Sequence, residues 1–257
     1  MYVYYNYSII YRKILNHCYK FYLNSMKNVM IRQPGYMPNL GFFKKIQSCD
    51  LFVFLDSVQF SKDSFDNRNR IKTDFGTEWI TVPLKRPVFG KKLNQVSISY
   101  DSDWIKEHSN LIFENYKSAP YFSSYWYEIE RILNQKSKLL IHLNLHLIDY
   151  FLKTLQITTE TLKSSEFLIS KNKTERLVEI CSQLNATCYI SGIGGKSYID
   201  ESLFKKSKIK LIYENFIHPK YDQLHGDFIK NMSIIDLLLN EGPKSSKILN
   251  KINLFSQ

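Results

Sequence analysis

Two stretches of this chain alternate short apolar runs with turns and helical patterns, and this alternation limits the fold more than any other feature. Val29 to Gln33 is an apolar run that leads through a turn into residues with helical spacing. Leu51 to Leu55 is a second, continuous apolar run. Such runs are typical of parallel strands buried on both faces of a sheet. The pattern predicts a βαβ unit at the start of the fold.

The same alternation returns in the last third of the chain. Thr174 begins a helical pattern, and Thr187 to Ile190 and Ile209 to Tyr213 are strand-like runs. Ser233 to Asn240 is a final apolar helix that ends before Gly242. We therefore expect an α/β fold built mainly on a parallel, Rossmann-like sheet.

The middle of the chain interrupts this order. Residues 61–77 are polar and predict a long loop, and the runs Glu78 to Val82 and Gln95 to Tyr100 predict a β-hairpin excursion. Helical stripes after Asp103 predict a helical lobe over about residues 103–160. We expect residues 26–257 to form one α/β domain that includes this lobe.

Residues 1–25 differ from the rest of the chain. They contain seven tyrosines and three basic residues but no acid. The order does not fit a signal peptide, and no stretch of the chain approaches the ~20 apolar residues of a membrane span. One hypothesis is that translation begins at Met26. The alternative is a peripheral membrane anchor, for which the segment lacks a clean helical stripe.

The charge balance favours acidic ligands. The 257 residues carry 35 Lys and Arg against 24 Asp and Glu, a net charge of +11. Solvated surface lysines are the alternative explanation. The basic residues are too dispersed to predict a nucleic-acid groove. Aromatic residues make up 15% of the chain, which suits a groove that stacks on sugar or base rings.

The cysteines and histidines predict neither a metal site nor a disulfide framework. Cys18, Cys49, Cys181 and Cys188 have no metal-ligand spacing, and His142 with His146 lacks the acid of a zinc-helix motif. The cysteines read as reduced thiols of a cytoplasmic protein, with core roles for Cys181 and Cys188.

Candidate chemistry begins at Asp56, which follows an apolar strand and is itself followed by Gln59. Ligands of parallel sheets gather at the carboxyl ends of strands, so Asp56 is a candidate base and Gln59 its neighbour in a catalytic role. The alternative for Asp56 is an ordinary loop cap.

Two further segments are candidate substrate-binding sites. The loop after the first strand supplies Arg32, Gln33 and Tyr36, although Pro and Gly there could serve only to turn the chain. The second segment combines amides and cations that suit phosphate or carboxylate recognition, with solvated charge as the alternative. Its residues are Asn67, Arg68, Asn69, Arg70 and Lys72.

A glycine-rich turn follows the strand that ends at Ile190. It consists of Ser191, Gly192, Ile193, Gly194, Gly195 and Lys196. A turn between a strand and a helix can present backbone N–H groups to an anion, which makes this segment a candidate phosphate site. It matches neither the Walker nor the dinucleotide fingerprint, so a purely structural turn stays open.

Several motifs in register resemble the WbqC-like family over about residues 29–243. They are Ile31 to Phe43, Phe52 to Phe60, Asn67 to Lys72, Trp79 to Pro83, Tyr189 to Gly195 and Ser233 to Leu238. The resemblance implies O-antigen or related surface-polysaccharide biosynthesis in bacteria, and an acyl or glycine transfer to a sugar. The family often has His before Gln-Pro, whereas this chain has Arg32, so a histidine base is not carried over.

Three functions compete at this stage. The first is transfer of an acyl or aminoacyl group to a nucleotide-linked amino sugar, with Asp56 as base and an acidic carrier protein as a candidate acyl donor. The second is a non-catalytic protein that binds a sugar nucleotide or an assembly complex. Nucleotidyl transfer ranks third, because the His-x-Gly-His signature of that chemistry is missing. No cofactor is indicated.

Overall fold

The predicted βαβ opening is present in the structure, a computed structural model that describes residues 27–62 and 64–255. Strand β1 (Asn28–Arg32) leads into helix α2 (Leu40–Gln47), and β2 (Leu51–Phe54) lies parallel to β1. The Asn39 side chain accepts a hydrogen bond from the backbone N–H of Phe42, which fixes the start of α2. The predictions on residues 1–25 and Cys18 lie outside the described residues.

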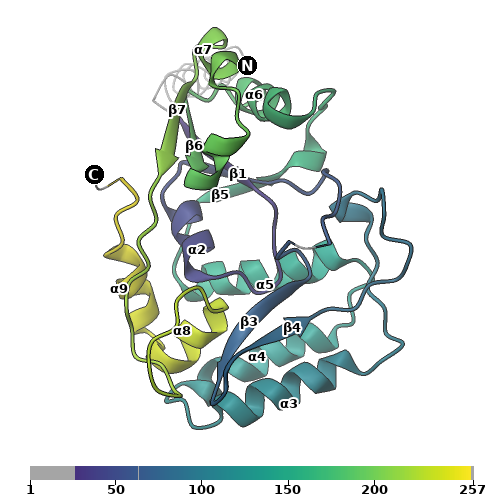
Figure 1. Cartoon of the computed structure of the whole chain (residues 1–257), viewed down its shortest axis with the longest axis vertical. Coiled ribbons are helices and arrows are strands. Elements are labelled where there is room, and N and C mark those ends of the chain that lie inside the picture. Colours follow the sequence, from purple (N-terminus) through teal and green to yellow (C-terminus); the bar gives the residue numbers. More distant parts are fainter. Residues whose placement is uncertain (1–26, 63, 256–257) are drawn as a thin grey trace, which may run out of the picture.

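A five-stranded parallel sheet forms the centre of the fold. It adds β5 (Glu160–Lys163), β6 (Cys188–Gly192) and β7 (Lys210–Glu214), in the order β5-β2-β1-β6-β7. The first described strand, β1, lies in the middle of the sheet. The next strands, β2 and β5, extend the sheet on one side of β1, and β6 and β7 then extend it on the other side. This change of direction places a topological switch point between β1 and β6 (Figure 1).

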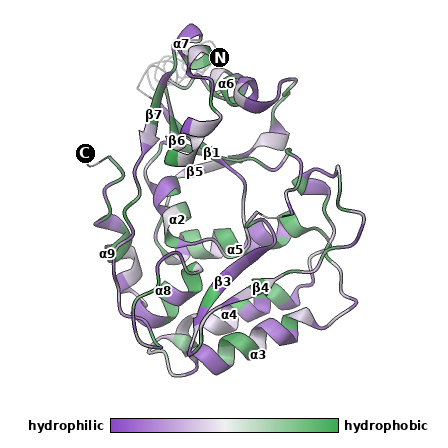
Figure 2. Ribbon diagram, in the orientation of Figure 1, coloured by the Kyte–Doolittle hydropathy of each residue, from purple (hydrophilic) through white to green (hydrophobic). Residues whose placement is uncertain are grey.

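Alternate residues of the strands pack against different helices. Val29, Leu51 and Val53 belong to a core shared with α6 (Lys173–Gln183) and α7 (Glu201–Lys206). Met30 and Phe52 belong to a larger core shared with α2 and α5 (Leu140–Thr154). Helices therefore cover both faces of the sheet, as the buried apolar runs predicted (Figures 1 and 2).

The helical lobe is also present. It consists of α3 (Trp104–Tyr116), α4 (Phe122–Asn134) and α5, and α4 packs against both α5 and α8 (Ile234–Glu241). Helix α9 (Lys244–Asn250) follows α8 and contacts α2. Because the buried residues of the lobe continue the larger core of the sheet, the lobe and the sheet are packed together.

The hairpin exists, and the predicted run Glu78 to Val82 overlaps its strand β4, but the partner strand differs from the one predicted. Strand β3 (Arg68–Thr73) pairs with β4 (Gly76–Thr81), whereas residues 95–100 make only isolated bridges and the turn η1 (Leu93–Gln95). The polar composition concealed β3, because its inward-facing Asn69 is an amide that satisfies buried carbonyl groups. Strand β5 and helix α9 were not predicted from the sequence either.

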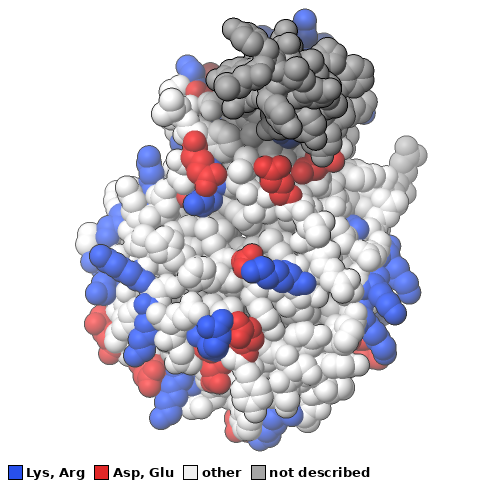
Figure 3. Space-filling model, turned by 180° about the vertical axis from the view of Figure 1, so that it is seen from behind, with Lys and Arg blue, Asp and Glu red and all other residues white. Residues whose placement is uncertain are grey.

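Surface charge is dispersed rather than concentrated on the face seen in Figure 3, where Lys and Arg alternate with Asp and Glu. The described cysteines are buried free thiols, as predicted for Cys181 and Cys188, and burial raises the pKa of Cys49 and of Cys181 to about 12. Over residues 27–62 and 64–255, no helix has both the length and the apolar character needed to cross a membrane.

Candidate functional site

A cavity of about 640 Å³ opens where β1, β6 and β7 end, at the switch point of the sheet. Its walls include Arg32 from the end of β1, Ser191 and Gly192 from the end of β6, and Glu214 from the end of β7. We call it the switch cavity. Parallel α/β sheets bind ligands at this position, because the connections on either side of the switch point diverge and leave a crevice.

Three charged groups meet in the switch cavity. Lys45 Nζ lies 2.7 Å from Glu214 Oε1, and the Glu214 side chain is almost fully buried. Within the described part of the chain, Glu214 Oε2 is buried and has no hydrogen-bond partner. Arg32 borders the open cavity and is exposed. The surrounding protein still removes part of the water around its guanidinium group, which lowers the pKa of Arg32, and the negative charge of Glu214 opposes this shift.

The charge balance of this trio favours the binding of an anion. Burial and the neighbouring Arg32 lower the pKa of Lys45, and the hydrogen bond to Glu214 opposes the shift. Arg32 and Lys45 therefore lie beside Glu214, and Asp66, which does not line this cavity, adds a smaller negative influence on Arg32. Because Lys173 and Arg176 also line the cavity, its cations outnumber its lining carboxylate, and an anionic ligand would offset this excess in a place where charge interactions are weakly screened.

The glycine-rich turn borders the same cavity. A β-carbon on Gly192 would lie 3.2 Å from Lys45 Nζ and 3.3 Å from Glu214 Oε1, so the absence of a side chain lets the backbone approach the ion pair. The turn continues as a 3-10 helix, η3 (Ile193–Ser197). Ser191, Gly194 and Gly195 also line the cavity, whereas Lys196 points toward the Tyr213 ring.

A smaller cavity of about 210 Å³ adjoins the first. Arg32 and Gln33 line both cavities, and Asp66 and Asn69 help to close the smaller one. We call it the Asp66 cavity. The sequence-predicted residues that border these two cavities are Arg32, Gln33, Asn69, Ser191, Gly192, Gly194 and Gly195.

Asp56 lies outside both cavities. Its Oδ1 accepts hydrogen bonds from Ser164 Oγ and Ser165 N, each at 2.8 Å, and its Oδ2 accepts one from Ser165 Oγ at 2.6 Å. These contacts hold the turn η2 (Ser164–Glu166) against the end of β2. They favour a structural role, and the predicted catalytic role stays a prediction. Gln59 is exposed and bridges to Lys92.

Two of the predicted binding residues face the interior. Tyr36 is fully buried, its hydroxyl lies 3.1 Å from His108 Nδ1, and burial raises its pKa. Asn67 is buried and donates a hydrogen bond to the carbonyl oxygen of Val82. The Tyr36 contact joins the Pro34 to Pro38 loop to helix α3, and the Asn67 contact joins the two ends of the β3–β4 hairpin.

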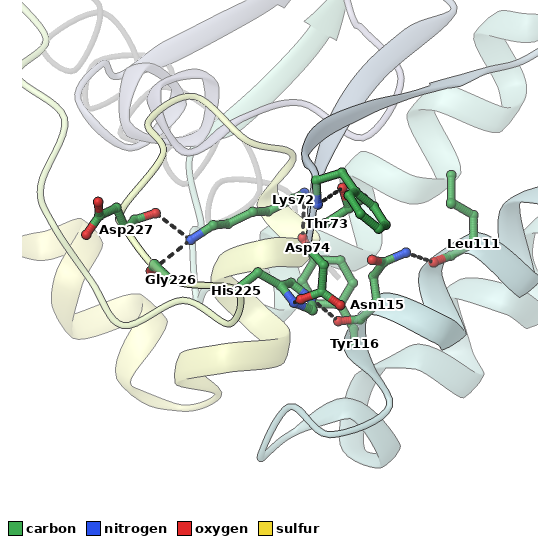
Figure 4. Close-up of polar contacts among 10 residues, drawn as sticks. Lys72, Thr73, Asp74, Leu111, Asn115, Tyr116, His225, Gly226 and Asp227 are labelled. Carbon is green, nitrogen blue, oxygen red and sulfur yellow. Dashed lines mark hydrogen bonds and ion pairs between the residues drawn. The ribbon is translucent and has the colours of Figure 1, made fainter.

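Arg68, Arg70 and Lys72 also lie away from the switch cavity. Arg68 and Arg70 stack over the half-exposed Trp79 ring, at 4.6 and 5.6 Å from its centre. Lys72 is buried, and its Nζ donates to the carbonyl oxygens of Gly226 and Asp227 (Figure 4). The sequence predicted these cations as part of a segment that binds phosphate or carboxylate, but they line neither of the two cavities.

Figure 4 also shows a polar clasp beside Lys72. His225 contacts the carboxylate of Asp74 through Nδ1, and its Nε2 lies 2.7 Å from the carbonyl oxygen of Asn115. The clasp joins the hairpin turn, helix α3 and the loop before α8. Across the described ranges, no group of three or more His, Cys, Asp or Glu residues is arranged to hold a metal ion.

Glu214, Lys45 and Asp66 are three of the charged cavity residues that the sequence did not single out. Glu214 ends a predicted strand, which is the same signal that singled out Asp56. Lys45 lies in the last turn of α2, where a basic residue is common for reasons of helix capping alone. Asp66 lay in a segment interpreted as loop. Only the strand-end position of Glu214 offered a usable sequence signal.

Fold and site together define a doubly wound α/β protein with a charged cavity at its switch point. The chain belongs to the WbqC-like protein family, whose sequence model matches residues 33–248. It is 35% identical over 228 residues to the uncharacterized protein Rv1507c of Mycobacterium tuberculosis, and the aligned region covers 87% of this chain and 98% of that protein. No solved structure matches the chain. The matched range includes Lys45, Asp66 and Glu214 and begins one residue after Arg32.

Proposed function

We propose that the protein binds a nucleotide-linked amino sugar in the switch cavity and transfers an acyl or aminoacyl group to the sugar nitrogen. The reaction would serve the synthesis of a bacterial surface polysaccharide in the cytoplasm. The observation that carries the proposal is the placement of Arg32 and Lys45 around one carboxylate at the switch point. Phosphate groups are the ligands that such a cationic crevice accommodates best.

The site offers separate groups for the charged and the neutral parts of this ligand. Arg32 and Lys45 would hold the diphosphate, and Gly192, whose backbone lies close to the ion pair, lines the same cavity. Arg176 and Lys173 border the same cavity and add to its positive charge. The open Glu214 Oε2 would accept a hydrogen bond from a sugar hydroxyl, which removes the penalty of leaving that oxygen unpaired.

Direct acyl transfer requires no nucleophile from the protein. The sugar nitrogen forms a bond to the acyl carbon, the bond from that carbon to the donor's leaving group breaks, and the nitrogen loses a proton to a base. A carrier-protein thioester is a suitable donor. Arg68 and Arg70, beside the exposed Phe65 and Trp79 rings, would attract an acidic carrier.

Calorimetric titration tests the binding step. We expect one or more of the UDP-, dTDP- and GDP-linked amino sugars to bind, and Arg32→Gln to weaken binding by about 10- to 100-fold, the value of a charge-assisted hydrogen bond. Arg131→Gln is the matched control, since Arg131 is an exposed arginine paired with Glu128 on α4. Equal affinities for wild type and Arg32→Gln would contradict the proposed site.

A non-catalytic sugar-nucleotide or assembly-complex binding protein is the second candidate. The contacts of Asp56 favour it, because they engage both oxygens of the predicted base. Incubation of the bound sugar nucleotide with thioester donors separates the two functions. An N-acylated sugar nucleotide, detected by mass spectrometry, supports the transferase, and saturated binding without product across donors supports the binding protein.

A further inference from the structure

The Asp66 cavity contains a buried carboxylate that the fold leaves incompletely paired. Asp66 is 3% exposed and lines the cavity, and its Oδ2 has no hydrogen-bond partner among the residues the structure describes. A buried acceptor without a partner costs free energy, so its retention calls for an explanation. A volume of about 210 Å³ is far above the roughly 10–15 Å³ that holds one water molecule.

Two other polar side chains of this cavity, Asn69 and Asn39, are already engaged. Asn69 Nδ2 donates to the carbonyl oxygens of Tyr36 and Met37, and Asn69 Oδ1 accepts from the backbone N–H of Arg70. Asn39 Oδ1 accepts from the first turn of α2. Their contacts hold the wall in place, and Asp66 Oδ2 is a buried acceptor of this wall that no described residue pairs.

The backbone that carries Asp66 is held firmly. Asn144 Nδ2 donates to the carbonyl oxygens of Pro34 and Asp66, at 3.0 and 2.8 Å. The Tyr36 N–H donates to the carbonyl oxygen of Phe65 at 3.0 Å, and a β-carbon on Gly35 would lie 2.7 Å from that oxygen. The carboxylate is therefore fixed beside the cavity by contacts on both sides of the chain.

We propose that the Asp66 cavity is a second subsite, which holds a primary amino group of the ligand against Asp66. The inference rests on the proposed function in one respect: it assigns the amino group of the nucleotide-linked sugar to this subsite. A cationic donor stabilises a buried carboxylate better than a neutral donor does, because it offsets the negative charge and also supplies the missing hydrogen bond. Arg32 and Gln33, which line both cavities, would separate this end of the ligand from its phosphates.

Paired ligands that differ only at the amino group test the subsite. Wild type should bind UDP-glucosamine about 10-fold more tightly than UDP-glucose, and Asp66→Asn should abolish this preference while UDP binds unchanged. Asp149→Asn, which removes an exposed carboxylate of α5 paired with Lys153, should retain the preference. Free glucosamine and glucose, compared by saturation-transfer NMR, should show the same dependence on Asp66.

The outcomes separate this inference from the proposed function. Tight binding of both UDP sugars without an Asp66-dependent preference would overturn the amino subsite and leave sugar-nucleotide binding intact. If no sugar nucleotide binds, the proposed function fails, and the comparison of free glucosamine with free glucose then tests the amino subsite by itself. Glucosamine binding that is lost in Asp66→Asn would then support the subsite, and equal behaviour of glucosamine and glucose would overturn it.

Discussion

Asp236, in the first turn of α8, and the cavity acids Glu214 and Asp66 differ in how completely their carboxylate oxygens are hydrogen-bonded. Asp236 Oδ2 accepts from the Tyr116 hydroxyl, and its Oδ1 accepts from the Tyr221 hydroxyl and Gln223 Nε2. Glu214 and Asp66 are buried to a similar degree, yet each has one oxygen that no described residue pairs. The contrast separates a carboxylate with a complete set of partners in the fold from two carboxylates for which we propose a ligand.

The largest predicted effect concerns the fully bonded acid. Asp236→Ala should lower the free energy of unfolding by about 3–5 kcal/mol, because three buried donors lose their acceptor and the nearby buried Lys72 loses a counter-charge. Denaturant unfolding measures this loss. Asp149→Ala, at an exposed position, should change stability by less than about 0.5 kcal/mol. A loss below about 1 kcal/mol at Asp236 would break the contrast.

A buried histidine of the helical lobe should show the next effect. Burial lowers the pKa of His108 to about 4, below the ~6.5 of an unfolded chain. The free energy of unfolding is therefore unaffected by this shift above pH ~6.5. It falls by about 2–3 kcal/mol as the pH drops from ~6.5 toward 4, because the unfolded chain binds the proton first. His108→Gln should reduce this acid dependence of stability, and exposed His142→Gln should not. Identical pH profiles for wild type and His108→Gln would contradict the burial argument.

Two glycines beside the cavities should respond differently to alanine. Gly35→Ala should cost about 1–3 kcal/mol, because its β-carbon would meet the Phe65 carbonyl oxygen at 2.7 Å and force the main chain to shift. Gly194→Ala meets nothing within 4 Å and should cost less than about 0.5 kcal/mol. Thermal unfolding compares the pair. Similar costs at both positions would show that the wall of the Asp66 cavity is not tightly built.

The smallest effect has the opposite sign. Burial raises the pKa of Asp66, so the carboxylate disfavours folding progressively as the pH rises through its folded pKa. Asp66→Asn removes that charge and should stabilise the protein at pH 7 by up to about 1 kcal/mol. Chemical unfolding at pH 7 gives the value. A clear loss of stability instead would place Asp66 with Asp236 as a structural acid.

Local sequence signals predicted the frame of the fold. Apolar runs such as Leu51 to Phe54 predicted four of the five strands of the sheet, and stripes such as that of α5 predicted the lobe, because buried faces leave a clear pattern of apolar residues. Strand β3 was missed, since its inward Asn69 is polar and finds its partners only in the folded chain.

Long-range contacts explain why only part of the site could be predicted. Arg32 and the glycine turn follow strand ends and line the switch cavity, while their ligand-binding roles stay predictions. Whether a strand-end acid is satisfied or open depends on partners distant in sequence. Ser164 and Ser165, which lie 108 and 109 residues further along the chain, donate hydrogen bonds to the Asp56 carboxylate. Within the described chain, no residue donates a hydrogen bond to Glu214 Oε2. Sequence spacing does not distinguish these cases.

A crystal structure with a bound sugar nucleotide, beginning with UDP-glucosamine, would show whether the ligand lies in the two cavities. We expect the diphosphate beside Arg32 and Lys45, near the ends of β1 and β6, with the sugar amino group against Asp66. Density for the ligand on the Trp79 surface, held by Arg68 and Arg70 while the switch cavity contains only solvent, would contradict it.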